Sequence, residues 1–322
     1  MRAVRITKLE GPESVEVVEL PEPKPDAAQY LIEVHAAGVT FPDLLMTRGA
    51  YQMKPSLPFV PGSEVAGIVR AAPAGGAHPA GSRVAAFPGI GGFQELVAVH
   101  PQAVFPLPDR MSFAAGAALP MNYLTVQFAL VRRGRLRAGE TVLVHGAAGG
   151  VGSAAVQLAK ALGARVIAVV SSDAKRTIAE QAGADEVILA DGFLAAAKSL
   201  TSGRGVDVVL DPVGGDRFTD SLRSLAPEGR LLVVGFTGGE IPTVKVNRLL
   251  LNNTEVVGVG LGAFLMHEPG LLQSQWSLLV PHLEAGRLDP PIGATYHLEE
   301  AGRALAEMEA RQAIGKTVLR VR

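Results

Sequence analysis

The chain has 322 residues, of which 48% are hydrophobic and 19% charged, a composition typical of compact globular domains and not of disordered segments. Its 30 basic and 31 acidic residues give a formal net charge of -1 at pH 7, which argues against nucleic acid or an anionic membrane as the main partner. Cysteine is absent, which excludes disulfides, thiolate nucleophiles and cysteine-ligated zinc.

The opening residues 1–6 predict a strand and not a signal peptide, because no long apolar run follows their charges. No segment contains the roughly 18 apolar residues that a membrane-spanning helix needs. We therefore expect a cytoplasmic protein.

The first 119 residues consist of short apolar runs separated by Gly and Pro. Such runs, bounded by turn residues, predict a mainly β domain, a barrel or a sandwich. An irregular α+β lobe is the alternative. The runs lie at residues 30–34, 64–69, 83–87 and 95–99.

From residue 141 the pattern changes to alternating strands and helices. Near-continuous apolar strands that alternate with helices predict a parallel sheet covered on both faces, in a doubly wound α/β domain of the Rossmann type. The predicted strands are 141–145, 166–170, 186–189, 206–210 and 230–234, and the predicted helices are 151–162, 174–182 and 218–225.

The last part of the chain does not continue this series. Residues 255–259 predict a sixth strand at the edge of the sheet, and an exposed apolar edge invites pairing with another chain. The helices expected at 271–283 and 299–310 and the strand expected at 317–321 return to complete the first domain.

A glycine-rich turn follows the strand 141–145, with glycines at 146, 149, 150 and 152. Closely spaced glycines let backbone amides approach a pyrophosphate, and the N-terminus of the next helix faces the phosphate with its positive dipole end. We expect the dinucleotide to contact Gly146, Ala148, Gly149, Gly150 and Val151. A strand–helix turn that binds no ligand is the alternative, and His145 is expected to be a packing residue.

The end of the second strand predicts which dinucleotide binds. An NAD enzyme places an acid about 20 residues after the glycines to bind the ribose 2′-hydroxyl. Val170 occupies that position here, and the hydroxyls of Ser171 and Ser172 with the cations of Lys175 and Arg176 suit a 2′-phosphate. We therefore expect NADPH. Asp173 keeps NAD open, and a solvated helix face is the alternative for the two cations.

These motifs resemble the zinc-independent quinone oxidoreductase (zeta-crystallin-like) branch of the medium-chain dehydrogenase/reductases over nearly the whole chain. The resemblance rests on the segments 36–43, 57–67, 146–152, 211–215 and 314–318. It implies a GroES-like catalytic domain of residues 1–120 and 262–322 around an inserted Rossmann domain of residues 121–261. It also implies a homodimer that joins two edge strands into one sheet.

The resemblance also bears on metal. Zinc-using relatives carry a cysteine where this chain has Thr40 and a histidine where it has Ser63. Two hydroxyls cannot replace those ligands, so we expect no metal. Asp43, Glu64 and His35 offer possible ligands, but Asp43 and Glu64 are expected to bind loop backbone instead.

Without a Lewis acid, an activated acceptor such as a quinone or an enone is the expected substrate, because hydride transfer to it needs only a hydrogen-bond donor at the developing oxyanion. Thr40 and Tyr51 are the candidate donors, and either hydroxyl could instead be buried and satisfied.

By resemblance, the turn at residues 122–125 opens a linker helix beside the nicotinamide, and a tyrosine that relatives place near the 2′-phosphate is replaced by Ala190. Further cofactor contacts are expected from Thr125, Val213, Gly235, Phe236 and Lys316. Substrate contacts are expected from Phe41 and Leu45, on a loop that also carries Thr40, and from Tyr123 and Phe264.

Two other functions compete with a quinone or enone reductase. A reductase of α,β-unsaturated acyl thioesters would need an added basic patch for the carrier's phosphates, and the sequence shows none. A crystallin-like protein would bind NADPH without turnover. Consumption of NADPH with a panel of quinones would separate an enzyme from a binding protein.

Overall fold

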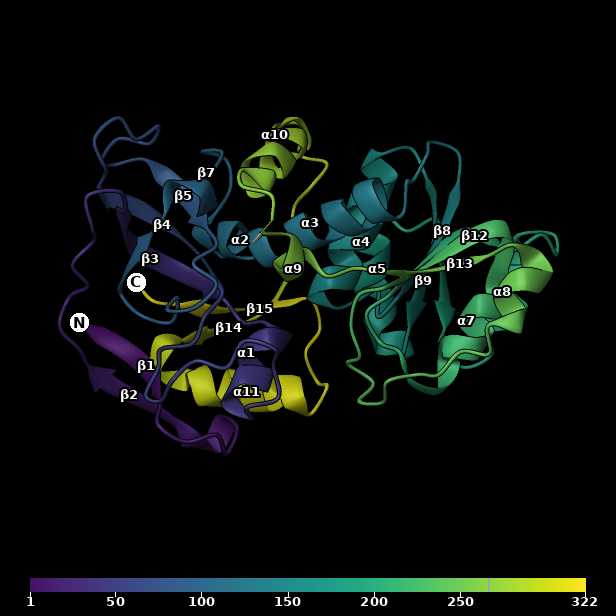
Figure 1. Ribbon diagram of the computed structural model, residues 1–322, viewed down its shortest axis with the longest axis horizontal. Helices are drawn as coiled ribbons and strands as arrows, with labels where there is room; N and C mark the ends of the chain where they lie inside the picture. The colour runs from purple at the N-terminus through teal and green to yellow at the C-terminus, as the bar shows by residue number, and fades with distance from the viewer. Residues whose placement is uncertain (266) are drawn as a thin grey trace. The chain divides into compact units, whose positions relative to one another are not determined.

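The computed structural model describes residues 1–265 and 267–322, which divide into two compact units. Unit 1 comprises Met1–Met121, Gly270–Ser277 and Ile292–Arg322, and unit 2 comprises Asn122–Pro269 and Leu278–Pro291. Both chain ends lie in unit 1 (Figure 1).

The units differ from the predicted domains in the tail. Residues 262–269 and 278–291, predicted for the catalytic domain, belong to unit 2. For the second segment the side chain of Gln157 supplies a reason: its amide donates to the Asp289 carbonyl at 2.6 Å, and its carbonyl accepts the Asp289 N–H at 2.9 Å. A glutamine on a Rossmann helix thus binds a segment more than a hundred residues away, which no local pattern reveals.

Unit 1 is mainly β, as predicted. Its larger sheet has the strand order β14-β15-β3-β4-β5-β7, with β6 paired to β3, and β1 and β2 form a separate antiparallel pair. The strands are β1 (Arg2–Ile6), β2 (Val15–Glu19), β3 (Tyr30–Gly38), β4 (Glu64–Ala71), β5 (Arg83–Ala86), β6 (Leu96–Val99), β7 (Val104–Pro106), β14 (Ile292–His297) and β15 (Lys316–Arg320). The returning tail is confirmed, because β15 pairs antiparallel with β3.

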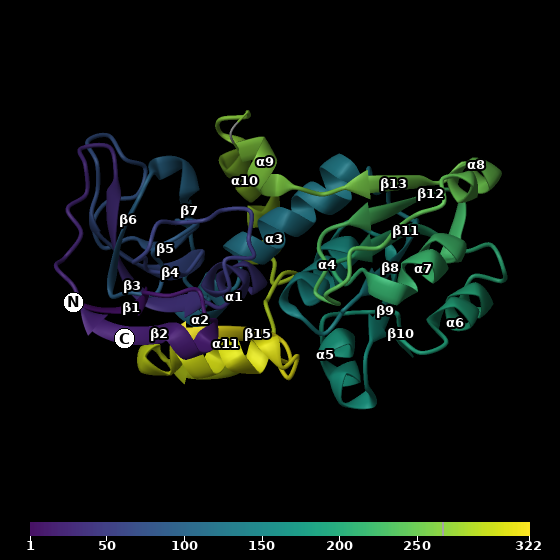
Figure 2. The same ribbon diagram turned by 60° about the horizontal axis from the view of Figure 1, so that its bottom comes forward.

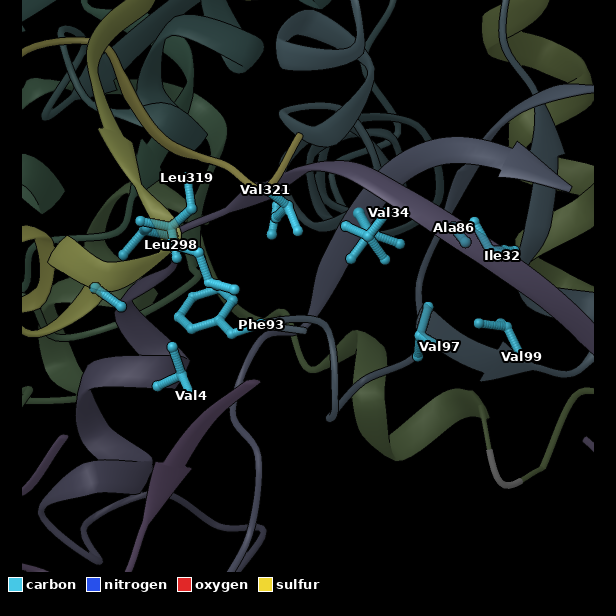
Figure 3. Close-up of a cluster of buried hydrophobic side chains, with 14 of the residues drawn as sticks. Val4, Ile32, Val34, Ala86, Phe93, Val97, Val99, Leu298, Leu319 and Val321 are labelled. Carbon is cyan, nitrogen blue, oxygen red and sulfur yellow. The ribbon is translucent and has the colours of Figure 1, made fainter. Parts of the chain in front are cut away.

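Short helices accompany these strands. They are η1 (Pro12–Ser14), α1 (Phe41–Thr47), η2 (Pro101–Ala103), α2 (Phe113–Ala117), η6 (Leu298–Glu300) and α11 (Ala301–Glu309). The core of unit 1 gathers apolar side chains from strands distant in sequence, among them Val4 of β1, Val34 of β3 and Leu319 of β15, with Phe93 between strands (Figure 3). The core of unit 1 therefore includes residues from both ends of the chain.

Unit 2 contains a six-stranded sheet of order β10-β9-β8-β11-β12-β13, with every neighbouring pair parallel. Numbered along the chain this order is 3-2-1-4-5-6, that of a Rossmann domain, so the fold prediction is confirmed. Its strands are β8 (Thr141–His145), β9 (Arg165–Val170), β10 (Glu186–Leu189), β11 (Val206–Asp211), β12 (Leu225–Val233) and β13 (Glu255–Gly258).

Helices cover this sheet, and α4 lies beside α5 while α6 lies beside α7 (Figure 2). The helices of unit 2 are α4 (Gly150–Ala161), η4 (Asp173–Lys175), α5 (Arg176–Gln181), α6 (Phe193–Leu200), η5 (Gly215–Arg217), α7 (Phe218–Ser224), α8 (Asn247–Asn252) and α9 (Leu261–Leu265). Helix α6, whose Phe193 and Ala197 are buried, is not among the predicted helices.

Two helices include residues of both units: α3 (Pro120–Gln127), which continues into the π-helix η3 (Phe128–Arg133), and α10 (Leu271–Glu284). Among the described residues, no helix is both long enough and apolar enough to cross a membrane.

Candidate functional site

The glycine-rich turn connects β8 to α4, as predicted. Gly146 has φ +59°, a conformation that side chains rarely adopt, and its carbonyl accepts the Gly149 N–H at 2.9 Å. A Cβ at Gly152 would overlap the Gly146 carbonyl oxygen, so only glycine allows the helix to pack this closely on the turn. The turn is therefore fixed by backbone geometry.

The start of α4 suits an anion. Gly149 is its N-cap and has no side chain that could cap the N–H groups of the first turn. Unpaired amides and the positive end of the helix dipole together bind phosphate. The turn thus passes a structural test for a dinucleotide pyrophosphate.

Other predicted cofactor residues gather at the same end of the sheet. Val213 lies against Gly146, because a Cβ on Gly146 would be 3.3 Å from a Val213 methyl group. The Gly238 N–H donates to the Val213 carbonyl at 2.8 Å, which holds the segment containing Gly235 and Phe236 beside the end of β11. The ends of β8, β11 and β12 therefore form one edge, where ligands bind in open α/β sheets.

Asp211 shapes this edge. Its Oδ1 accepts the N–H groups of Val213 at 2.8 Å and Gly214 at 2.9 Å, which fixes the turn after β11. Burial raises the pKa of the Asp211 carboxyl, against those two hydrogen bonds.

The lip that follows β9 carries the residues predicted to select the cofactor. Val170 is buried at the end of the strand, Ser171 and Ser172 are exposed, and Lys175 is half-buried in η4. Arg176, the second predicted cation, is committed elsewhere: its Nε donates to Asp173 at 2.6 Å and its Nη1 to the Val187 carbonyl at 2.6 Å. The lip thus presents hydroxyls beside an acid that is already ion-paired.

The expected turn at residues 122–125 is not present. These residues lie inside α3, which begins at Pro120. Thr125 is half-buried on this helix, and Tyr123 is 1% exposed and donates to Gln157 Oε1 at 2.6 Å. In this structure Tyr123 packs inside unit 2 and its hydroxyl is not available to a substrate.

Phe264 also packs within unit 2. Its ring lies 5.0 Å from the ring of Phe128, and the guanidinium of Arg132 covers it at 4.8 Å. Phe264 stays half-buried on α9, so an apolar surface remains, but its environment combines a cation with an aromatic pair.

In unit 1, the predicted substrate loop is the helix α1, and Thr40 is its N-cap. The Thr40 hydroxyl accepts the Asp43 N–H at 3.3 Å and donates to Asp43 Oδ2 at 2.5 Å, and the Thr40 N–H donates to the same oxygen at 2.9 Å. Because this capping box uses the hydroxyl proton, Thr40 is a helix cap here and not a free hydrogen-bond donor.

Asp43 joins two loops and is fully buried. Besides Thr40, it accepts the Gly62 N–H at 3.2 Å and the Ser63 hydroxyl at 2.8 Å on Oδ1. Burial raises the pKa of Asp43, against these hydrogen bonds. The two hydroxyls that replace the zinc ligands of relatives therefore both donate to one carboxyl group.

Glu64 and Lys316 form a buried ion pair, with side chains 0% and 4% exposed. Glu64 also accepts the Met121 N–H at 2.7 Å, and burial raises its pKa while the Lys316 ammonium opposes this. The prediction that Asp43 binds loop backbone is confirmed by its bond to Gly62, whereas Glu64 binds the backbone of the first turn of α3. Lys316, predicted to contact the cofactor, instead neutralises Glu64 in this structure.

The remaining predicted residues of unit 1, Phe41, Leu45 and Tyr51, are each partly exposed. Phe41 and Leu45 lie four residues apart on α1 and are half-buried, so they share one helix face. Tyr51 packs against Ile6, Met46 and Phe59. Within the described residues the Tyr51 hydroxyl has no hydrogen-bond partner, and burial followed by the charge of Asp43 raises its pKa.

His145 is a packing residue, as predicted. It is 0% exposed, its Nε2 lies 2.8 Å from the Ser221 hydroxyl, and its ring meets Phe193 edge-on at 4.8 Å. Burial, with a smaller contribution from the charge of Arg217, lowers its pKa to about 3.

Two features of the structure, the cap of α1 and the ion pair at the lip, were not predicted although the sequence contains a pattern for each. Thr40 followed by Asp43 at the third helical position is a capping-box pattern, and Asp173 with Arg176 has the i,i+3 spacing of a helical ion pair. The Glu64–Lys316 pair had no local signal, because its members are 252 residues apart (316 minus 64).

Comparison with known proteins identifies the family. Residues 26–109 match the family model of the alcohol dehydrogenase GroES-like domain, and residues 150–282 match that of zinc-binding dehydrogenase. The bovine quinone oxidoreductase-like protein 2 is 38% identical over 309 residues, which cover 94% of this chain and 88% of that protein.

Solved structures agree over the whole chain. A probable oxidoreductase from Mycobacterium abscessus is 45% identical with a TM-score of 0.91, and the match covers 100% of this chain and 99% of that one. Escherichia coli quinone oxidoreductase, solved as a complex with NADPH, is 30% identical with a TM-score of 0.89, and the match covers 100% of both chains.

The matching domains, the Rossmann strand order and the glycine turn lead to one conclusion: the chain belongs to the quinone oxidoreductase-like members of the medium-chain dehydrogenase/reductase superfamily and is an oxidoreductase.

Proposed function

We propose that this oxidoreductase uses NADPH to reduce a quinone or an α,β-unsaturated carbonyl compound without zinc. The observation that carries the cofactor assignment is the lip after β9, where Val170 replaces an acid and the nearby Asp173 is paired with Arg176. A 2′-phosphate meets donors there and no unpaired carboxylate of this segment. The Escherichia coli relative, solved with NADPH, supports the same choice.

The donor set of unit 1 supports a zinc-free reaction. The hydroxyls of Thr40 and Ser63 are weak zinc ligands and both donate to Asp43. Glu64 is neutralised by Lys316, which leaves it a poor partner for a cation. The described residues contain no group of three His, Cys, Asp or Glu side chains placed to hold a metal ion.

NADPH supplies the hydride when it is bound, and the chain must then stabilise the oxyanion of the reduced acceptor. Of the two predicted donors, we favour Tyr51, because the Thr40 hydroxyl already donates its hydrogen bond to Asp43. A tyrosine whose pKa is raised stays protonated at neutral pH and can donate. Phe41 and Leu45 supply an apolar surface for a flat, ring-shaped substrate.

Steady-state oxidation of NADPH with a panel of quinones and enones tests this function, with the protein assayed before and after dialysis against a chelator. We expect turnover with at least one acceptor, no loss after dialysis, and far less than one equivalent of zinc by elemental analysis. Binding of NADPH without turnover would indicate a crystallin-like protein. Activity that disappears with a stoichiometric zinc ion would contradict the zinc-free reaction.

We also propose a homodimer. β13 lies at one end of the sheet and pairs only with β12 among the described strands, and the preceding helix exposes Leu250 (76%) and Leu251 (75%). An apolar edge with apolar neighbours favours pairing with a second copy across a twofold axis. Light scattering at micromolar concentration should give twice the chain mass, and a monomer would contradict this. A cytoplasmic location stays a prediction.

A further inference from the structure

The pair formed by Asp173 and Arg176 lies at the lip that is proposed to select the cofactor. Asp173 follows the strand end at Val170 by three residues and its side chain is 77% exposed, whereas the side chain of Arg176 is 34% exposed. In sequence, Asp173 is the acid nearest to the position where an NAD enzyme carries its ribose-binding carboxylate. The charge of Asp173 therefore affects how tightly a dinucleotide binds at this lip.

Arg176 holds this acid from a fixed position. Its Nε donates to Asp173 Oδ1 at 2.6 Å, while its Nη1 donates to the carbonyl of Val187 at 2.6 Å. Val187 belongs to β10, which pairs with β9, so the guanidinium is fixed to the sheet as well as to its own helix. A surface ion pair alone is weak and mobile, but a backbone anchor of this kind reduces the freedom of the arginine.

An unpaired carboxylate and a 2′-phosphate repel each other, since the phosphate carries nearly two negative charges at neutral pH. The same unpaired carboxylate attracts a ribose 2′-hydroxyl, which is how NAD enzymes recognise their cofactor. The state of Asp173 can therefore favour either cofactor, and Arg176 determines that state.

We propose that Arg176 is a specificity-determining residue that acts through Asp173: it neutralises and restrains this carboxylate, so that the lip accepts NADPH in place of NADH. This inference rests on the proposed function, because it assumes that the lip binds the adenosine ribose. It assigns Arg176 a positioning role, in contrast to Lys175, which we expect to contact the phosphate.

The test compares kcat/KM for NADPH and NADH in wild type, Arg176→Gln, Asp173→Asn and the double variant. We expect Arg176→Gln to lower kcat/KM for NADPH about fivefold and to raise that for NADH about twofold, since like charges now face the phosphate. The double variant should recover NADPH use to within about twofold of Asp173→Asn. Added salt should reduce the effect of Arg176→Gln.

A control with the same i,i+3 spacing exists on α7, where Arg223 donates to Asp220 at 2.9 Å and the two side chains are 58% and 45% exposed. Arg223→Gln should leave the NADPH to NADH ratio unchanged. Thermal unfolding of all variants separates a structural effect from a change in specificity.

Three results would overturn the inference. If the double variant stays as poor with NADPH as Arg176→Gln, Arg176 contacts the phosphate directly. If both cofactors weaken equally and the melting temperature falls, the bond to Val187 has only a structural role. If Arg176→Gln changes neither cofactor, Asp173 has no influence at the lip. A wild type that prefers NADH would instead contradict the proposed function, which the first measurement shows by itself.

Discussion

The glycine turn of unit 2 and the buried polar cluster of unit 1 both contain polar groups that need hydrogen-bond or ion-pair partners. They differ in where those groups lie in the sequence. The turn uses backbone atoms of seven consecutive positions, from Gly146 to Gly152. The cluster uses the side chains of Asp43, Glu64 and Lys316, which the fold brings together from distant parts of the chain. Only the first can be predicted from spacing.

The difference teaches how far a residue type indicates a role. A glycine at a positive φ or under a helix has few alternatives, so its role follows from its position. A hydroxyl or an ammonium group takes its role from the partner that it meets. Thr40 was predicted to contact the substrate, and in the structure its hydroxyl donates to Asp43. Lys316 was predicted to contact the cofactor, and in the structure it pairs with Glu64.

The largest expected effect tests the cluster. Lys316→Met leaves the Glu64 carboxylate buried without its cation, which should cost about 3–5 kcal/mol of unfolding free energy. Combining it with Glu64→Gln should recover most of this loss. Urea denaturation measures the stability of each variant.

The same double variant decides whether Lys316 has a second role. If it folds and its KM for NADPH matches that of wild type, Lys316 only balances charge. A KM raised severalfold in a stable double variant would show that the predicted cofactor contact exists as well.

The next effect tests the turn. Gly152→Ala places a methyl group against the Gly146 carbonyl oxygen, and overpacking of this kind should cost about 1–3 kcal/mol and weaken NADPH binding more than tenfold. At Gly149 a Cβ would be 3.4 Å from the same oxygen, so Gly149→Ala should be tolerated by the fold. A loss of NADPH affinity in a stable Gly149→Ala protein would then report the bound phosphate. Gly262→Ala, where a Cβ meets open space, is the neutral control. Equal affinity for NADPH in Gly152→Ala and wild type would contradict a cofactor site at this turn.

The third effect is a pH dependence at the start of the turn. The pKa of His145 is about 3 in the folded protein and about 6.5 in the unfolded protein. Between these two pH values the unfolded state binds a proton that the folded state does not bind. Its contribution to stability is therefore complete above pH 6.5 and is lost as the pH falls from 6.5 toward 3, by about 1.4 kcal/mol per pH unit. Denaturation of wild type and His145→Gln between pH 7.5 and 5 measures this. The stability of wild type relative to the variant should fall in acid, and a constant difference would exclude a buried neutral histidine.

Much of the fold followed from the sequence, for physical reasons that also set the limits. Short apolar runs predicted the strands: the bounds 141–145 match β8, which is largely buried, and the bounds 186–189 match β10, a half-buried strand at the end of the sheet. The predicted helix 174–182 is divided into the 3-10 turn η4 and the helix α5, and the sequence pattern does not show this division. The predicted loop at Thr40 is the N-terminus of helix α1, which the capping box of Thr40 and Asp43 fixes.

The candidate site divides in the same way. The turn and the strand ends around Val213 lie where the sequence predicted them, because sheet topology fixes them. Tyr123 and Thr40 took other roles, because a nearby Gln157 or Asp43 satisfies the hydroxyl. Sequence spacing cannot show which acceptor will lie beside a given hydroxyl in the folded protein.

The most direct test of the account concerns Lys175, the predicted phosphate contact on the lip after β9. A charge-assisted hydrogen bond at a partly exposed site contributes about 1.5 kcal/mol, so Lys175→Ala should raise the KM for NADPH roughly tenfold. NADH has no phosphate there, and its KM should stay within about twofold of wild type. Steady-state kinetics with both cofactors and one quinone provide the measurement. Equal weakening of both cofactors, or a wild type that prefers NADH, would contradict the claim that this lip selects NADPH.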